Sequence, residues 1–229
     1  MSFAVMQPYL FPYLGYYQLV HAANKFVFYD DVTFIKGGYI NRNNILANGK
    51  AQRFTVPVPG MSSNTLINEL SFDNNVKKIL KTIEQSYKKS PNFANVFPLI
   101  ESVLCDDNRS VEYICAKSIS LVFDYLSIAK DFCFSSALEY NRDLSAADKL
   151  ISMAGVLKSN CYINSPGGKS LYNKDYFSNK GVDLFFIEME YYEYKQNSDR
   201  FIPHLSMIDI LMHNSKTDVI DMLTKYKLV

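Results

Sequence analysis

The sequence has almost no net charge, because 24 lysine and arginine residues are matched by 23 aspartate and glutamate residues. A chain without a basic excess has no overall field to attract a polyanion, so we do not expect nucleic acid as a partner. It also lacks a linker rich in proline, serine or glycine, and its 229 residues suit one domain. We therefore predict a single domain over residues 1–229.

Cysteine is sparse and shows no pairing pattern. The four residues lack a C-x-x-C pair and a histidine at zinc spacing, and we interpret them as reduced core thiols of a cytoplasmic protein. They are Cys105, Cys115, Cys133 and Cys161. With three histidines far apart in the chain, no metal site is predicted.

Long hydrophobic runs are missing as well. No stretch reaches the ~18 uninterrupted apolar residues of a membrane-spanning helix. The first 24 residues contain no Asp, Glu, Lys or Arg, but Gln7, Pro8 and Pro12 interrupt their apolar run. Without an early basic residue they do not form a secretory signal. We therefore expect a soluble protein in the cytoplasm.

A strand, helix and strand pattern opens the chain. Residues 3–6 form a short apolar run, residues 14–23 have helical apolar spacing, and residues 25–29 form a second run. Such a unit implies parallel strands with a right-handed crossover. From residue 145 to residue 187 helix and strand alternate again, which predicts further parallel pairing.

Two additions interrupt this α/β pattern. Asn48-Gly49 stands between residues 40–46 and 53–58 and is typical of a hairpin turn. Residues 75–129 have helical spacing and predict a helical insertion or cap. The fold class is therefore α/β, with a mostly parallel sheet, flanking helices, a β-hairpin and this insertion. We expect a last helix from Thr217 to the C-terminus.

The loop after the first strand is rich in aromatic residues, with five between residues 9 and 17. Ligands of open α/β sheets bind outside the carboxyl ends of strands, and phenol rings suit sugars or bases. The alternative is that the tyrosines only hold the loop against the core. The candidate substrate contacts are Gln7, Tyr9, Tyr13, Gly15, Tyr16 and Gln18.

Asp30 and Asp31 end the second strand, and the two-residue period sends their side chains to opposite faces. Asp31 is a candidate general base and Asp30 a candidate substrate contact, whereas a turn-forming pair is the structural alternative. An ion pair between Arg42 and Asp31 is a second structural alternative. The donors downstream that could hold a diphosphate or a carboxylate are Lys36, Asn41, Arg42 and Asn43.

Residues 165–170, Ser-Pro-Gly-Gly-Lys-Ser, lie between a predicted strand and a helix. Glycines and helix N-terminal amides there can hold an anion, and a tight turn is the alternative. The segment is not a P-loop, since Ile163 stands at the first glycine position. Its candidate substrate contacts are Asn164, Gly167, Gly168 and Lys169.

Histidine titrates near neutral pH without help, which makes His204 and His21 candidate catalytic bases. His21 follows an apolar helix face, so packing is its alternative role. His204 precedes Ser206-x-x-Asp209, a capping box that opens a helix, and Ser206 and Asp209 are candidate substrate contacts as well. No G-x-S-x-G motif is present, so a Ser-His-Asp hydrolase is not predicted.

Six stretches together resemble, in order, the successive motifs of the WbqC-like family. They are residues 6–19, 26–32, 39–43, 162–168, 194–196 and 205–209. Tyr39 stands where the family often has Trp, and His213 stands where Phe is expected.

The resemblance implies a role in bacterial O-antigen or other surface-polysaccharide (lipopolysaccharide) biosynthesis. The implied activity is transfer of an acyl or aminoacyl group to the amine of a nucleotide-linked deoxyamino sugar. Such an enzyme needs an aromatic platform, cations for the diphosphate and a base. The acyl donor stays open, no cofactor is assigned, and a homo-oligomer is one option. The candidates are Tyr9, Tyr13 and Tyr16 for the platform, Lys36, Arg42 and Lys169 for the diphosphate, and Asp31 or His204 for the base.

Two other functions are compatible with the sequence. Residues 11–16 weakly resemble the His-x-Gly-His loop of nucleotidyltransferases and adenylate-forming ligases, with Tyr13 and Tyr16 at the histidine positions. That resemblance implies nucleotide binding and carboxylate activation. The third option is a non-catalytic binding protein of a polysaccharide assembly complex.

Overall fold

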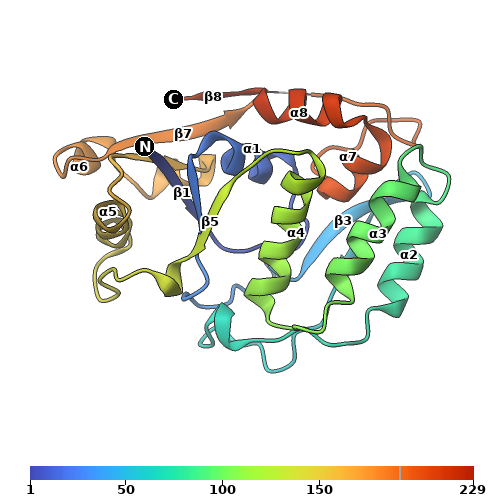
Figure 1. The fold of residues 1–229 in the computed structure, drawn as a ribbon, viewed down its shortest axis with the longest axis horizontal. Coiled ribbons are helices and arrows are strands. Elements are labelled where there is room, and N and C mark those ends of the chain that lie inside the picture. The colour runs from blue at the N-terminus through green and yellow to red at the C-terminus, as the bar shows by residue number, and fades with distance from the viewer. Residues whose placement is uncertain (191) are drawn as a thin grey trace.

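A six-stranded sheet forms the centre of the molecule, in the order β5-β2-β1-β6-β7-β8 (Figure 1). The computed structural model describes residues 1–190 and 192–229. Every neighbouring pair in the sheet is parallel except β7 and β8. The strands are β1 (Ser2–Met6), β2 (Lys25–Phe28), β5 (Asp131–Phe134), β6 (Cys161–Asn164), β7 (Asp183–Met189) and β8 (Tyr226–Leu228). The prediction of an α/β fold with a mostly parallel sheet is confirmed.

Both faces of the sheet are covered by apolar side chains. Ala4 and Phe26 belong to one hydrophobic cluster and their neighbours Phe3 and Val27 to the other, as strand alternation requires. The smaller cluster includes side chains of α5 (Ala146–Val156) and α6 (Lys174–Ser178). The larger cluster includes those of α1 (Leu14–Ala22), α2 (Lys77–Tyr87), α3 (Phe93–Leu104), α4 (Val111–Tyr125), α7 (Met207–His213) and α8 (Lys216–Thr224).

The predicted insertion and hairpin are both present. Helices α2, α3 and α4 lie within residues 75–129, and Figure 1 shows them side by side. The hairpin consists of β3 (Arg42–Ala47) and β4 (Lys50–Thr55). Asn48 and Gly49 have φ angles of 50° and 70°, as the favoured two-residue turn requires. The hairpin forms a separate sheet, and β3 packs against α2 and α7.

Two edge strands were not predicted. The expected last helix stops at Thr224, and β8 follows it, antiparallel to β7. Strand β5 has the four residues Asp-Phe-Cys-Phe and pairs with β2. Short strands of this kind are formed by their partners rather than by local propensity, so periodicity does not reveal them.

All four cysteines are free. Cys115 is buried, but Cys105 is exposed on the surface, which corrects the expectation that every cysteine lies in the core. Cys105 follows the last residue of α3. None of the helices within the described part of the chain is long and apolar enough to span a membrane.

The direction in which strands are added to the sheet reverses between β1 and β6. From β1 the chain continues to β2 and β5 on one side, whereas from β6 it continues to β7 and β8 on the other. Pairing of β1 with β6 stops at Phe3 and Tyr162, although both strands continue. Ligands of open α/β proteins bind at the carboxyl ends of strands at such a reversal.

Candidate functional site

Two adjoining cavities lie where the chain leaves β1 and β7, and they share Tyr13 and His204. The larger has a volume of about 280 Å³ and the smaller about 70 Å³. The larger is lined by Tyr9, Pro12, Tyr13, Tyr39, Asn43 and His204. The smaller is lined by Tyr13, Leu14, Met189, Glu190, Tyr192, Tyr194, Phe201, Pro203, His204, Leu205 and Ile210. We call the two cavities together the Tyr13–His204 groove.

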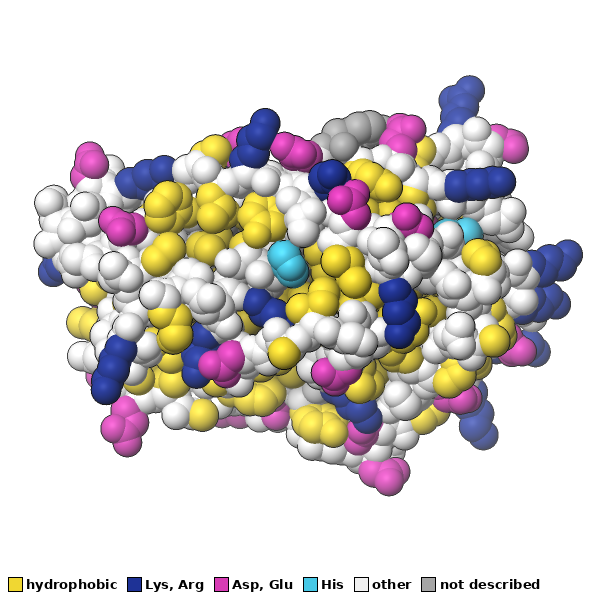
Figure 2. Space-filling view, turned by 45° about the horizontal axis from the view of Figure 1, so that its top comes forward, with side chains coloured by type: hydrophobic (Ala, Val, Ile, Leu, Met, Phe, Trp, Pro, Cys, Tyr) yellow, Lys and Arg dark blue, Asp and Glu magenta, His cyan; other side chains and the backbone are white. Residues whose placement is uncertain are grey.

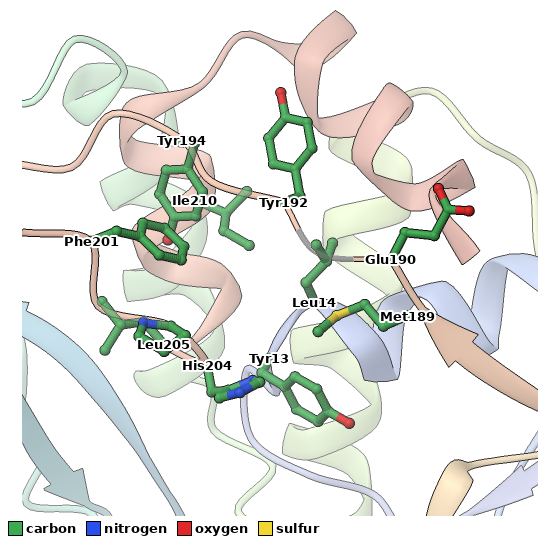
Figure 3. Close-up of a pocket in the computed structure, with 11 residues that line it drawn as sticks. Tyr13, Leu14, Met189, Glu190, Tyr192, Tyr194, Phe201, His204, Leu205 and Ile210 are labelled. Carbon is green, nitrogen blue, oxygen red and sulfur yellow. The ribbon is translucent and has the colours of Figure 1, made fainter. Parts of the chain in front are cut away.

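The groove is mostly apolar in its walls. In Figure 3, Phe201 and Leu205 face Leu14 and Met189 across the smaller cavity, and Glu190 stands at its edge. Figure 2 shows hydrophobic side chains gathered around a histidine on one face of the molecule. A surface hollow with aromatic and aliphatic walls and a few polar groups is typical of a small-molecule site.

Backbone carbonyls of the aromatic loop hold the groove together. Phe11 has a left-handed backbone with φ 42°, and its carbonyl accepts hydrogen bonds from Asn43 Nδ2 and from Ser206 Oγ, both at 2.7 Å. The amide of Met207 donates to the carbonyl of Pro12 at 2.8 Å. The first loop, β3 and the start of α7 therefore meet at one point.

His204 also has a left-handed backbone, with φ 58°. Its exposed ring lies edge-on to the ring of Tyr13, with centroids 6.0 Å apart and an angle of 77°. The residues after it are buried, and Ser206 N donates to Asn44 O at 2.8 Å. Left-handed conformations of residues other than glycine are strained and gather at functional sites.

Among the described lining residues, the polar groups of the groove are phenols, the amide of Asn43, one imidazole and one carboxylate. Burial raises the pKa of Tyr9 and of Tyr13, so both phenols stay protonated at neutral pH and can donate hydrogen bonds. Glu190 pairs with Lys227 at 3.5 Å, and both side chains reach solvent.

A buried carboxylate fixes one wall of the groove. Asp209 is fully buried and accepts hydrogen bonds from Tyr87 Oη at 2.7 Å, Tyr194 Oη at 2.6 Å and Gln196 Nε2 at 3.2 Å. Burial, and then Asp209, raise the pKa of both phenols. Ser206 Oγ accepts from Ile208 N and begins α7. The Asp209 side chain thus connects segments that are distant in the sequence. It does not accept a hydrogen bond from the backbone amide of Ser206, which the predicted capping box requires.

The paired aspartates are bound by the segment that follows β5. Asp30 accepts hydrogen bonds from Ser136 N at 2.9 Å and Ser136 Oγ at 2.6 Å, and both aspartates accept from Ser135 Oγ. Asp31 forms its ion pair with Arg142, at 2.8 Å, rather than with Arg42. Because both carboxylates reach the same hydroxyl of Ser135, the prediction that their side chains point to opposite faces is wrong. Strand β2 ends at Phe28, so strand alternation does not extend to the two aspartates.

The predicted cations lie outside the groove. Arg42 donates to the carbonyls of Gly37 and Gly38 in the loop before β3, and Lys169 pairs with Glu188. Lys36 is exposed and lines neither cavity.

The asparagine candidates Asn41 and Asn164 form hydrogen bonds with the backbone, and the two glycine candidates differ in the space around them. Asn41 Nδ2 donates to Val56 O at 2.9 Å, next to the hairpin. Asn164 Oδ1 accepts from Ser165 N at 2.7 Å. A Cβ atom on Gly168 would come within 2.2 Å of Asn164 Nδ2, so the Asn164 side chain would have to move, whereas at Gly167 the nearest atom is 3.9 Å away.

The remaining candidates lie directly after β1 and on α1. Gln18 Nε2 donates to the carbonyls of Met222 and Lys225, which ties α1 to α8. His21 is on the last turn of α1, beside Tyr226, and burial and then Lys130 lower its pKa. Tyr16 Oη donates to Gln7 O at 2.9 Å.

Of the sequence candidates, the structure brings Tyr9, Tyr13, Asn43 and His204 together in the groove. Sequence reasoning missed a larger set of lining residues, although residues 190–194, Glu-Tyr-Tyr-Glu-Tyr, carry a visible aromatic signal. Those missed include the aromatic or polar residues Tyr39, Glu190, Tyr192, Tyr194 and Phe201, together with the apolar residues Pro12, Leu14, Met189, Pro203, Leu205 and Ile210. Within residues 1–190 and 192–229, no three His, Cys, Asp or Glu side chains gather in a way that could hold a metal ion.

Known proteins place the chain in a family. It is 21% identical over 215 residues to the uncharacterized protein Rv1507c of Mycobacterium tuberculosis, and the match covers 92% of each chain. No solved structure matches it. The pattern of the WbqC-like protein family matches residues 7–220, nearly the whole length. The chain therefore belongs to the WbqC-like protein family.

Proposed function

We propose that the protein transfers an acyl or aminoacyl group to the amine of a nucleotide-linked deoxyamino sugar, in the biosynthesis of a bacterial surface polysaccharide. The sugar binds in the Tyr13–His204 groove. The observation that carries this proposal is the shared wall of Tyr13 and His204, with Glu190 lining the same groove.

The walls of the groove suit a deoxy sugar. The carbon-bound hydrogens of a sugar ring pack on the faces of Tyr9, Tyr13 and Tyr39, which line the larger cavity. Protonated phenols donate hydrogen bonds to the remaining hydroxyl groups. Removal of a hydroxyl makes the sugar less polar, which fits the aliphatic side chains of Leu14 and Met189 in the smaller cavity.

The carboxylate and the imidazole of the groove suit the amine. The Glu190 carboxylate attracts the ammonium form of the sugar, and the His204 imidazole accepts a proton from it. The free amine then attacks the carbonyl carbon of an ester or thioester donor. A carbon–nitrogen bond forms, the bond from the acyl carbon to the carrier oxygen or sulfur breaks, and the carrier leaves with the electron pair. The second amine proton passes to the carrier or to water.

Adenylate formation is supported less well. A transferring phosphate needs cations around it, and no Lys or Arg is among the described residues that line the groove. Lys227 approaches the rim through its ion pair with Glu190, and it can meet the diphosphate of a nucleotide sugar outside the groove.

Ligand-dependent melting tests the proposal. A dTDP-linked 4-amino-4,6-dideoxy sugar at a hundred times its dissociation constant should raise the melting temperature by about 5–10 °C. The matched control is the dTDP sugar with a hydroxyl in place of the amine. Because it lacks the charge that Glu190 attracts, it should give a smaller shift.

Product formation is then measured by mass spectrometry of the amino sugar incubated with acetyl, formyl and glycyl donors. An acylated sugar is the expected product. A larger melting shift with ATP and Mg²⁺ than with the amino sugar would favour adenylate formation. No shift with either ligand would favour a non-catalytic binding protein.

Gly15→Ala is expected to weaken binding of the amino sugar about tenfold. A Cβ atom at Gly15 would come within 2.6 Å of the Tyr13 ring, so the ring must leave its position in the groove. Isothermal titration of the sugar measures the effect. The matched control is Gly155→Ala in α5, where a Cβ meets nothing within 4 Å and affinity should not change. Equal affinities for both variants would contradict a role for the Tyr13 ring.

A further inference from the structure

A second pair of cavities lies near the Asp209 network, apart from the Tyr13–His204 groove. Their volumes are about 320 and 140 Å³, and they share His213 and Asn197. The larger is lined by Lys89, Ser90, Pro91, Lys195, Gln196, Asn197 and His213. We call it the His213 cavity. None of its described lining residues belongs to the groove.

His213 contributes a hydrogen-bonding atom without a partner. Its Nδ1 lies 2.8 Å from the carbonyl oxygen of Asp209, so Nδ1 carries the ring proton. The side chain is only 8% exposed. Its Nε2 atom is buried and has no hydrogen-bond partner among the described residues. Buried polar atoms are seldom left unpaired, so Nε2 indicates a missing partner.

Two lysines supply positive charge to the same cavity. Lys89 follows the C-terminal end of α2, and Lys195 lies in the segment after β7. Both are exposed, and neither forms an ion pair with any described residue. Their ammonium groups are therefore free to meet an anion, together with the side chains of Ser90 and Asn197.

We propose that the His213 cavity binds the phosphoryl group of a small molecule. Neutral His213 can only accept a hydrogen bond at Nε2, whereas protonated His213 donates one there. A phosphate monoester gains or loses a proton near pH 6, so it can form a hydrogen bond with either form of the imidazole. Its P–OH group donates to the neutral ring, and its unprotonated oxygens accept from the charged ring. An ionised carboxylate can only accept hydrogen bonds, so at Nε2 it can pair with the protonated imidazole alone.

The Asp209 carboxylate does not exclude an anion from this cavity. It lies on the Nδ1 side of the ring, 3.7 Å from that atom, and its oxygens accept hydrogen bonds from Tyr87, Tyr194 and Gln196. Nε2 is on the other edge of the ring. This binding does not depend on the proposed acyl transfer.

The test titrates the whole protein with inorganic phosphate and follows the Cε1–Hε1 signals of its three histidines by NMR. The His213 signal, identified by its loss in His213→Gln, should shift and saturate, while the signals of His21 and His204 stay in place. In Lys89→Gln/Lys195→Gln the dissociation constant should rise about tenfold or more.

The matched control is Lys77→Gln/Lys81→Gln, which removes the same charge from exposed positions of α2 that line neither cavity. This variant should bind phosphate as the native protein does. A second arm replaces phosphate by acetate at equal ionic strength, and binding should be weaker. The proposal is overturned by an unmoved His213 signal, by equal loss in both lysine variants, or by acetate binding as tightly as phosphate.

Discussion

Replacement of Asp209 by asparagine is expected to lower the free energy of unfolding by about 3 kcal/mol. The native carboxylate accepts hydrogen bonds from two phenols and one amide in a fully buried position. The amide group of asparagine offers one acceptor oxygen and brings two donor hydrogens toward groups that already donate. Tyr87 Oη cannot easily turn, since it also accepts from Leu46 N at 2.8 Å.

Urea denaturation followed by circular dichroism measures this change. The matched control is Asp221→Asn in α8, where the carboxylate is 54% exposed and pairs with Lys225 at 3.3 Å. That variant should differ from the native protein by less than about 0.5 kcal/mol. A loss of less than about 1 kcal/mol for Asp209→Asn would show that the network contributes little to stability.

Replacement of His204 by asparagine should lower the rate of the proposed transfer by a factor of about 10² to 10⁴. The imidazole is the group of the groove that we assign to deprotonate the amine. Asparagine is chosen because it tolerates the left-handed backbone at this position, φ 58°, better than most residues do. The fold should therefore survive, and the loss should fall on kcat.

His21→Asn is the control for this experiment, because both histidines are candidate bases in the sequence. His21 stands on the last turn of α1 beside Tyr226 and lines neither cavity of the groove. We expect its kcat to stay within a few-fold of the native value. A large loss for His21→Asn with little loss for His204→Asn would reverse the assignment. Asp31→Asn, measured in the same way, tests the third candidate base.

The Asp209 network links the two sites that we propose. Tyr194 lines the groove and Gln196 lines the His213 cavity, and both donate to Asp209. The Nδ1 atom of His213 forms a hydrogen bond with the backbone carbonyl oxygen of Asp209. Stability, the shape of the groove and the second cavity therefore depend on one buried carboxylate.

Features with a local cause were predictable. The first strand, α1 and β2 follow from apolar spacing, and the hairpin follows from Asn48-Gly49. Helices α2, α3 and α4 follow from 3.6-residue periodicity in residues 75–129. In each case the residues that specify the element are neighbours in the chain.

Features that depend on contacts between residues far apart in the sequence could not be predicted. Asp31 meets Arg142 across 111 positions, and Tyr87 meets Asp209 across 122. The β8 strand exists because β7 offers it a free edge. A carboxylate in a sequence has many compatible partners, and only the folded chain selects one of them.

The groove shows both kinds of cause. The sequence predicts the aromatic loop and its position after β1, because the end of a strand is specified by residues that are neighbours in the chain. Their union with His204 and with the wall at Met189 and Glu190 was decided by the tertiary structure. Hydrogen bonds from Asn43 and Ser206 to the backbone carbonyl of Phe11 join the first loop to β3 and to the start of α7. The pairing of β7 with β6 holds the strand that ends at Met189. No sequence spacing connects these segments, because their contacts form only when the chain folds.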